Sequence, residues 1–123
     1  MTEAEARKRE FKERTKQFAC RVIRLYCAIP KAQTEAQVVG RQMLRSGTSV
    51  AAVYREASRA RSRADFVSKI EMCAQEADET QLWLELLRDA CGFKAALLAD
   101  LWKESDELIA IFVTMARDAK GNA

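Results

Sequence analysis

Arginines on one predicted helix are the residues of this chain best suited to bind a ligand. On a helical wheel, an arc of about 80° holds arginines and no carboxylate. The members are Arg41, Arg45, Arg55 and Arg59, and Arg61 and Arg63 continue the row into the next turn. A guanidinium is a rigid fork of donors that stays charged at ordinary pH, so such a row suits phosphate oxygens. The sequence predicts a surface that binds the RNA or DNA backbone, and no aromatic residue among the arginines supports base stacking.

Two other uses of the arginines stay open. Charged rows on helices are often solvated, and they also pair with rows of opposite charge. The following predicted helix carries an acidic row that could pair with the arginines across a subunit contact. This row consists of Glu71, Asp78, Glu85 and Asp89. The alternative function is therefore a structural or adaptor ring that recruits another protein, with its arginines engaged between subunits.

Catalytic and cofactor-binding patterns are missing from the sequence. The chain has no histidine, which removes the commonest general base and metal ligand. No glycine-rich phosphate loop occurs, and the hydroxyls of Ser46, Thr48 and Ser49 have no base nearby in sequence. Small hydroxyl residues on a helix more often allow a neighbouring helix to approach closely. We expect a protein that is not an enzyme and has no catalytic residue, cofactor or metal.

The composition predicts an all-α fold in one domain, residues 1–123. One proline and four glycines leave few places for turns, and 49% hydrophobic residues suffice for one core. Apolar residues recur at spacings of three and four, which is the period of an amphipathic helix. Four such stretches cover about residues 3–29, 34–60, 63–91 and 94–119. With short connections they predict an antiparallel up-down-up-down four-helix bundle.

Local signals mark several predicted helix ends. Pro30 stops the first helix, and Thr34 is the expected N-cap of the second. Ser62 with Asp65 predicts the start of the third helix, and Gly92 predicts its end.

A second apolar surface predicts self-association. Several large apolar residues fall outside the inward stripes of their helices, and soluble monomers rarely expose so many together. The expected oligomer interface comprises Cys20, Ile23, Cys27, Leu82, Trp83, Leu86, Trp102 and Ile109. For any single residue of this set, the alternative is that it packs into a wide core of its own bundle and not into an interface.

Charge is unevenly distributed along the sequence, and no targeting segment is visible. Residues 1–63 hold 15 basic and 6 acidic side chains, whereas residues 64–123 hold 6 and 12. This asymmetry favours a polyanionic partner or head-to-tail pairing of subunits. No apolar run is long enough for a membrane span or signal peptide, so we expect a cytoplasmic protein without membrane partners and with reduced cysteines.

Several ordered motifs resemble one family of bacterial proteins. The motifs lie between about Phe11 and Arg117. They are Phe11-Lys12-Glu13-Arg14-Thr15, Val22-Ile23-Arg24-Leu25, Leu44-Arg45-Ser46-Gly47-Thr48-Ser49-Val50, Tyr54-Arg55-Glu56-Ala57, Ala60-Arg61-Ser62 and Trp83-Leu84-Glu85-Leu86-Leu87. The chain resembles the four-helix-bundle proteins encoded in intervening sequences of bacterial 23S ribosomal RNA genes. That group is in turn similar to the accessory variability proteins of diversity-generating retroelements.

The resemblance implies a closed homopentameric ring with a basic surface. In the retroelement relatives this surface engages nucleic acid and a reverse transcriptase, so a reverse transcriptase is an implied candidate partner here. No catalytic residue is associated with the family. The chain departs from the family pattern at Ala51, Val53 and Leu82, where glycine, asparagine and tyrosine are common.

Overall fold

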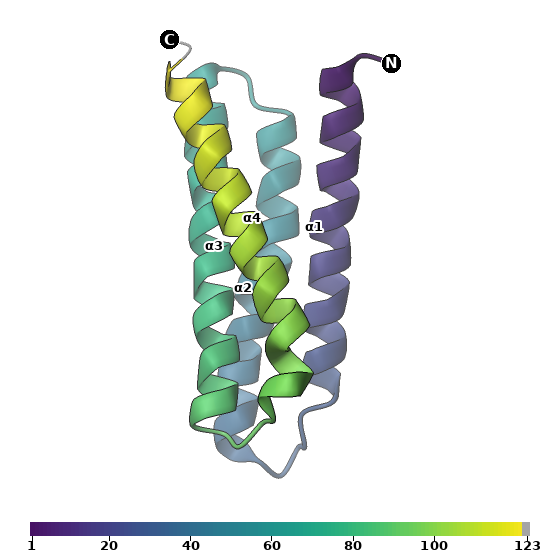
Figure 1. Ribbon diagram of the computed structural model, residues 1–123, viewed down its shortest axis with the longest axis vertical. Coiled ribbons are helices and arrows are strands. Elements are labelled where there is room, and N and C mark those ends of the chain that lie inside the picture. The colour runs from purple at the N-terminus through teal and green to yellow at the C-terminus, as the bar shows by residue number, and fades with distance from the viewer. Residues whose placement is uncertain (122–123) are drawn as a thin grey trace.

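Four antiparallel helices form the described structure (Figure 1). The computed structural model describes residues 1–121. Helix α1 spans Glu3–Cys27, α2 spans Thr34–Ser58, α3 spans Arg63–Asp89 and α4 spans Ala95–Gly121. Short connections join consecutive helices, so the N-terminus, the α2–α3 connection and the C-terminal end of α4 lie at the same end of the bundle. The predicted all-α four-helix fold is confirmed, and no helix within residues 1–121 is long and apolar enough to cross a membrane.

Side-chain and backbone caps define the helix ends. The Ser62 hydroxyl accepts from the Asp65 N–H, as predicted, and starts α3. Gly92 has a φ of 78°, a conformation that glycine adopts without strain, and the Phe93 N–H then bonds the Leu87 carbonyl. A capping box at Thr2 and Glu5 starts α1, which the sequence reading missed. Each cap satisfies backbone groups that the helix itself leaves unpaired.

The start of α2 differs from the prediction. Thr34 is the first helical residue, and Gln33 occupies the N-cap position without a side-chain bond to the helix. The side-chain amide of Gln33 instead donates to the Cys91 carbonyl, tying this turn to the α3–α4 connection. Gln37, three residues after Thr34, makes no bond to the start of α2, because its amide donates to the carbonyls of Ile29 and Pro30. The N-cap assigned to Thr34 was therefore wrong.

The first three helices end two residues earlier than predicted. In α1, the N–H of Ala28 bonds carbonyls of the last turn, and the helix closes before Ile29. Residues that precede a proline disfavour the helical conformation, so Pro30 ends α1 ahead of its own position. Ile29 is nevertheless buried in the connection between α1 and α2. The apolar stripe of α1 therefore continues beyond the last helical residue.

The core follows the predicted stripes closely. Large side chains from all four helices are fully buried, among them Phe18, Met43, Ile70 and Phe112. Each helix also buries one hydroxyl side chain, and each hydroxyl bonds a carbonyl of its own helix. These residues are Thr15, Ser46, Thr80 and Ser105. Small polar groups therefore enter the core without leaving hydrogen-bonding atoms unsatisfied.

Helix α1 is packed mainly against α2. Few residues of α1 and α4 approach each other, and the two helices diverge toward the end that carries the termini (Figure 1). Arg14 bridges them through two 2.8 Å bonds to the carboxylate of Glu104, with Glu107 at 3.8 Å. This bidentate contact raises the pKa of Arg14, chiefly through its hydrogen bonds with Glu104.

We predict that Gly47 limits how closely α1 and α2 pack. A Cβ at this position would lie 2.8 Å from both Cγ atoms of Val22. The side chain of Val22 is short and branched, so a change of rotamer cannot relieve this contact. Gly47→Ala is therefore expected to lower the free energy of unfolding by about 1–2 kcal/mol in urea titrations. Gly40→Ala is the comparison, because its Cβ would meet the movable Cδ1 end of Ile29 and lie 3.1 Å from the edge of the Tyr26 ring, and a change within about 1 kcal/mol is expected. Equal destabilisation by both variants would contradict this steric explanation.

Candidate nucleic-acid interface

Helix α2 positions the predicted arginine row. The helix runs unbroken through Gly47, which is the condition for aligning arginines on both sides of it. Small residues make this possible, since Ser46 and Gly47 are buried against neighbouring helices. The Thr48 hydroxyl bonds the Leu44 carbonyl and so satisfies its donor within the helix. The small residues are packing residues, whereas the arginine side chains are exposed to solvent.

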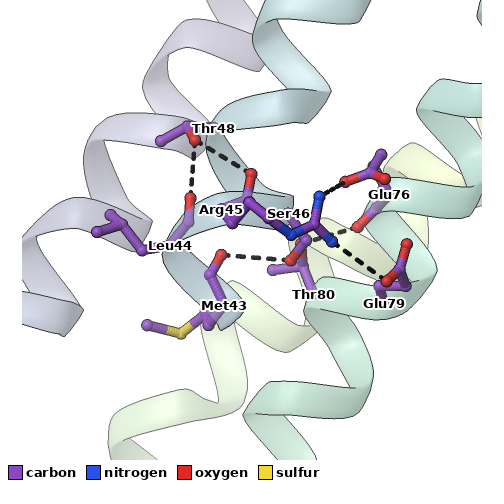
Figure 2. A network of polar contacts seen from close by, with 8 residues as sticks. All are labelled: Met43, Leu44, Arg45, Ser46, Thr48, Glu76, Glu79 and Thr80. Carbon is purple, nitrogen blue, oxygen red and sulfur yellow. Dashed lines mark hydrogen bonds and ion pairs between the residues drawn. The ribbon is translucent and has the colours of Figure 1, made fainter. Parts of the chain in front are cut away.

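Arg45 is held by two carboxylates of α3. Its guanidinium nitrogens lie 3.3 Å from Glu76 and 3.3 Å from Glu79 (Figure 2). Directly beneath, the hydroxyl oxygens of Ser46 and Thr80 lie 2.7 Å apart and share a hydrogen bond. Since Thr80 donates its one proton to the Glu76 carbonyl, the single Ser46 proton is directed mainly to Thr80, and the Met43 carbonyl at 3.3 Å is its more distant second acceptor. Arg45 thus forms the outer part of a polar contact between α2 and α3.

Burial perturbs Glu76 in this contact. Its pKa is raised, mainly by desolvation, while the nearby Arg45 charge acts to lower it. Glu79, on the same helix face, repels Glu76 and raises its pKa further. The guanidinium of Arg45 therefore stabilises two carboxylates that would otherwise repel each other.

The remaining arginines are exposed and fall into two places. Arg41 lies in the first half of α2, and no ion pair joins it to any residue between 1 and 121. Arg55 and Arg59 lie at the other end of α2, followed by Arg61 in the connection to α3. The paired Arg45 separates the two groups. The row predicted from the helical wheel is geometrically present, but its charges are free only at the two ends.

A basic hollow surrounds the α2–α3 connection. It has a volume of about 430 Å³ and is lined by Arg55, Glu56, Arg59, Arg61, Asp65 and Lys69. Within residues 1–121, the three arginines make no ion pair, whereas Lys69 lies 3.2 Å from the carboxylate of Glu56. We call these six residues the turn pocket. Its position at the end of α2 gathers the second half of the predicted row into a concave site.

Arg63 faces a neighbouring hollow. That hollow is lined by Arg63, Ala64, Val67, Ser68, Glu71 and Lys120. Lys120 of α4 pairs with Glu71 at 2.7 Å. Arg63 thus stands beside the turn pocket and is oriented toward the α3–α4 side of the bundle.

Sequence reasoning missed Lys69 as a member of this site. The helical wheel of one helix cannot show that a lysine of the next helix lies beside its last turn. An antiparallel hairpin with a short connection sets residues equidistant from the turn side by side, but these two residues are not equidistant, so the sequence carries no clear signal for the pair. Glu56 lies three residues before the connection at residues 59–62 and Lys69 lies seven residues after it, yet the structure pairs them at 3.2 Å.

The predicted oligomer interface divides into exposed and partly packed residues. Ile23 and Leu82 are 42% and 46% exposed, and Cys27 is also exposed. Trp83, Trp102 and Ile109 are half-buried against the core, and the Trp102 indole donates to Glu85. Cys20 and Leu86 are half-buried as well. Both tryptophans thus pack partly into the core of their own bundle, which was the alternative for single residues of this set.

The cysteines and carboxylates form no metal site in the described part of the chain. No group of three or more cysteine, aspartate or glutamate residues there is placed to hold an ion. All four cysteines are free, and burial raises the pKa of Cys73 to about 12. Such a thiol is unreactive at neutral pH.

We predict that Arg45 contributes to stability in a pH-dependent way. In Arg45→Met the apolar stem is kept and the charge is lost, so the pKa of Glu76 rises further above its ordinary value of 4.5. Urea unfolding near neutral pH should show a loss of about 1 kcal/mol. Because the folded state then binds a proton more readily, the loss should shrink as pH falls through the raised pKa of Glu76. Arg41→Met is the control, and an equal or pH-independent loss in both variants would contradict the assignment.

Comparison with known proteins agrees with this fold. A family model described as 23S rRNA-intervening sequence protein matches residues 7–114, while no curated protein matches the chain. The fold is similar to the crystal structure of a protein of unknown function from the S23 ribosomal protein family of Bacteroides thetaiotaomicron VPI-5482. The TM-score is 0.78 at 34% identity, covering 85% of this chain and 96% of that one. The family model spans most of the sequence, and the chain therefore belongs to the family of 23S rRNA-intervening sequence proteins.

Proposed function

We propose that this protein is a non-enzymatic factor that binds the phosphate backbone of RNA or DNA. The observation that supports this most is the group of exposed arginines at the α2–α3 connection, Arg55, Arg59 and Arg61, which lack ion pairs within residues 1–121. Guanidinium groups without internal partners are available to displace counterions from phosphates. Arg45 is not needed for this contact, since Glu76 and Glu79 already neutralise it.

The binding we propose depends on charge and shape more than on sequence. No aromatic side chain lines the turn pocket, so there is no platform on which bases could stack. Affinity should then fall steeply with salt and vary little between sequences. Arg41 and Arg63 lie outside the pocket and extend the basic surface along α2 and toward α4.

We further propose that the protein acts as a homo-oligomeric ring of five subunits. The exposed apolar residues Ile23 and Leu82 support association, because large apolar side chains on a monomer surface favour burial in an interface. Charge also supports head-to-tail contacts, since α1 and α2 belong to the basic half of the chain and α3 and α4 largely to the acidic half. A head-to-tail interface generates a ring when its rotation closes.

One prediction of this proposal concerns the binding of nucleic acid. In titrations of the protein against labelled structured RNA and duplex DNA, the triple variant Arg55→Gln, Arg59→Gln, Arg61→Gln should bind weakly, and its salt slope should fall by about 2–3. A control variant, Arg24→Gln, Lys31→Gln, Lys94→Gln, removes the same charge from exposed residues at the opposite end of the bundle. The control should retain most of the slope. Indifference of binding to the first variant would reject the proposed interface.

The second prediction concerns assembly. Light scattering of the wild type should give five times the chain mass of 13.9 kDa, and Ile23→Glu with Leu82→Glu should lower this mass while the helix content remains. Exposed apolar residues tolerate charge in the monomer, whereas an interface would have to desolvate it. The arginine triple variant should keep the mass of the wild type. Loss of the ring in that variant would instead favour the adaptor alternative, in which the arginines make subunit contacts.

A further inference from the structure

We propose that the turn pocket binds a phosphomonoester dianion, namely the terminal phosphate of an RNA strand. This inference rests on the proposed function, because the strand is the nucleic acid that the basic surface would hold. It goes further in assigning one pocket to one chemical group. The internal phosphodiesters of the strand would be left to the more open surface around Arg41 and Arg63.

The charge balance of the pocket favours a dianion. Its six lining residues include four cations and two carboxylates, so the lining carries two net positive charges. One cation, Lys69, is already paired with Glu56 at 3.2 Å. The other three are guanidinium groups, which face a single further carboxylate, that of Asp65. A terminal phosphate carries close to two negative charges at neutral pH, whereas an internal phosphodiester carries one.

The carboxylates also argue against an internal segment of the strand. Glu56 and Asp65 are part of the lining, and any phosphate that followed the first one through the pocket would approach them. Like charges this close together repel even where water screens them. A strand that ends in the pocket avoids this repulsion, since it places one phosphate among the arginines and leads away on one side only.

The shape of the pocket fits an end group. A volume of about 430 Å³ accommodates a phosphate with its attached sugar and lies within the range of small-molecule sites. Arg55 lies in the last turn of α2, Arg59 at its C-cap and Arg61 in the connection, so guanidinium groups from three levels of the chain line one hollow. Arginine forks match the geometry of phosphate oxygens through paired hydrogen bonds.

The framework around the pocket is well anchored. The Ser62 hydroxyl caps α3 through the Asp65 N–H, which fixes the connection between Arg61 and Asp65. The ion pair of Lys69 with Glu56 joins α3 to the last turns of α2. Because both walls are fixed, ligand binding would mainly order the arginine side chains. Arg41, in contrast, lies on the open surface of α2 and lines no described hollow of this kind.

The test compares one short RNA in three forms, with a 5′-phosphate, a 3′-phosphate or hydroxyls at both ends. We expect one phosphorylated form to bind the wild-type protein about tenfold more tightly than the hydroxyl form at moderate salt. Arg59→Gln with Arg61→Gln should abolish this preference while weaker, salt-dependent binding of all three forms remains. The control Arg41→Gln should weaken the three forms equally and keep the preference. A variant with Arg59→Lys in place of Arg59→Gln should recover part of the affinity for RNA. It should recover less of the preference for the phosphorylated form, since lysine lacks the forked donors of a guanidinium.

The outcomes separate the pocket from the general surface. Equal, salt-dependent binding of all three forms to the wild type would overturn the pocket assignment and leave the proposed function standing. Failure of every form to bind at low salt would overturn the proposed function and this inference with it. Inorganic phosphate, added as a competitor, should erase the preference only at concentrations far above the RNA. Binding of inorganic phosphate as tight as that of the RNA end would overturn the assignment to a nucleic-acid terminus.

Discussion

The close approach of α2 to both of its neighbours is the constraint on which the rest of the structure depends. On one side Gly47 leaves room for the branched side chain of Val22, and on the other the Ser46 and Thr80 hydroxyls meet at 2.7 Å. Small residues at adjacent positions thus serve two different interfaces. Because α2 is fixed on both sides, its far surface has a defined orientation, and the arginines on that surface are presented in a fixed direction.

The same helix shows how one residue type can be used in two ways. Arg45 neutralises carboxylates that α3 places beside the hydroxyl contact, whereas Arg55 and Arg59 have no such partners in the described residues. The difference arises from the neighbouring helix and not from α2 itself, since α3 carries Glu76 and Glu79 at one level and Lys69 near the turn. A single row thus contains one arginine paired within the fold and two exposed arginines without such pairs in residues 1–121.

Periodicity and cap residues were sufficient to predict most of the fold. The inward stripes, the Ser62 cap and the Gly92 terminus follow from local rules that tertiary contacts did not override. Thr34 was misassigned because Gln33 and Gln37 bond carbonyls of other segments, which no local pattern reveals. The site was predicted less completely. The arginines could be placed on one face, but the pairing of Arg45 and the contribution of Lys69 depend on the register between α2 and α3, which the helical wheel of either helix leaves undetermined.

The sparse contact between α1 and α4 affects which part of the bundle opens locally. Helices α2, α3 and α4 pack in sequence, while α1 contacts α2 extensively and reaches α4 mainly through Arg14. Residues 1–10, which include the first two turns of α1, are all exposed, so little apolar area holds that part in place. The contact between α1 and α4 is thus much the weakest between neighbouring helices, and regions with few buried contacts are those that open locally before global unfolding. Backbone amides near the start of α1 should accordingly exchange with solvent through small fluctuations, while those in the centre of α2 exchange only when the whole bundle opens.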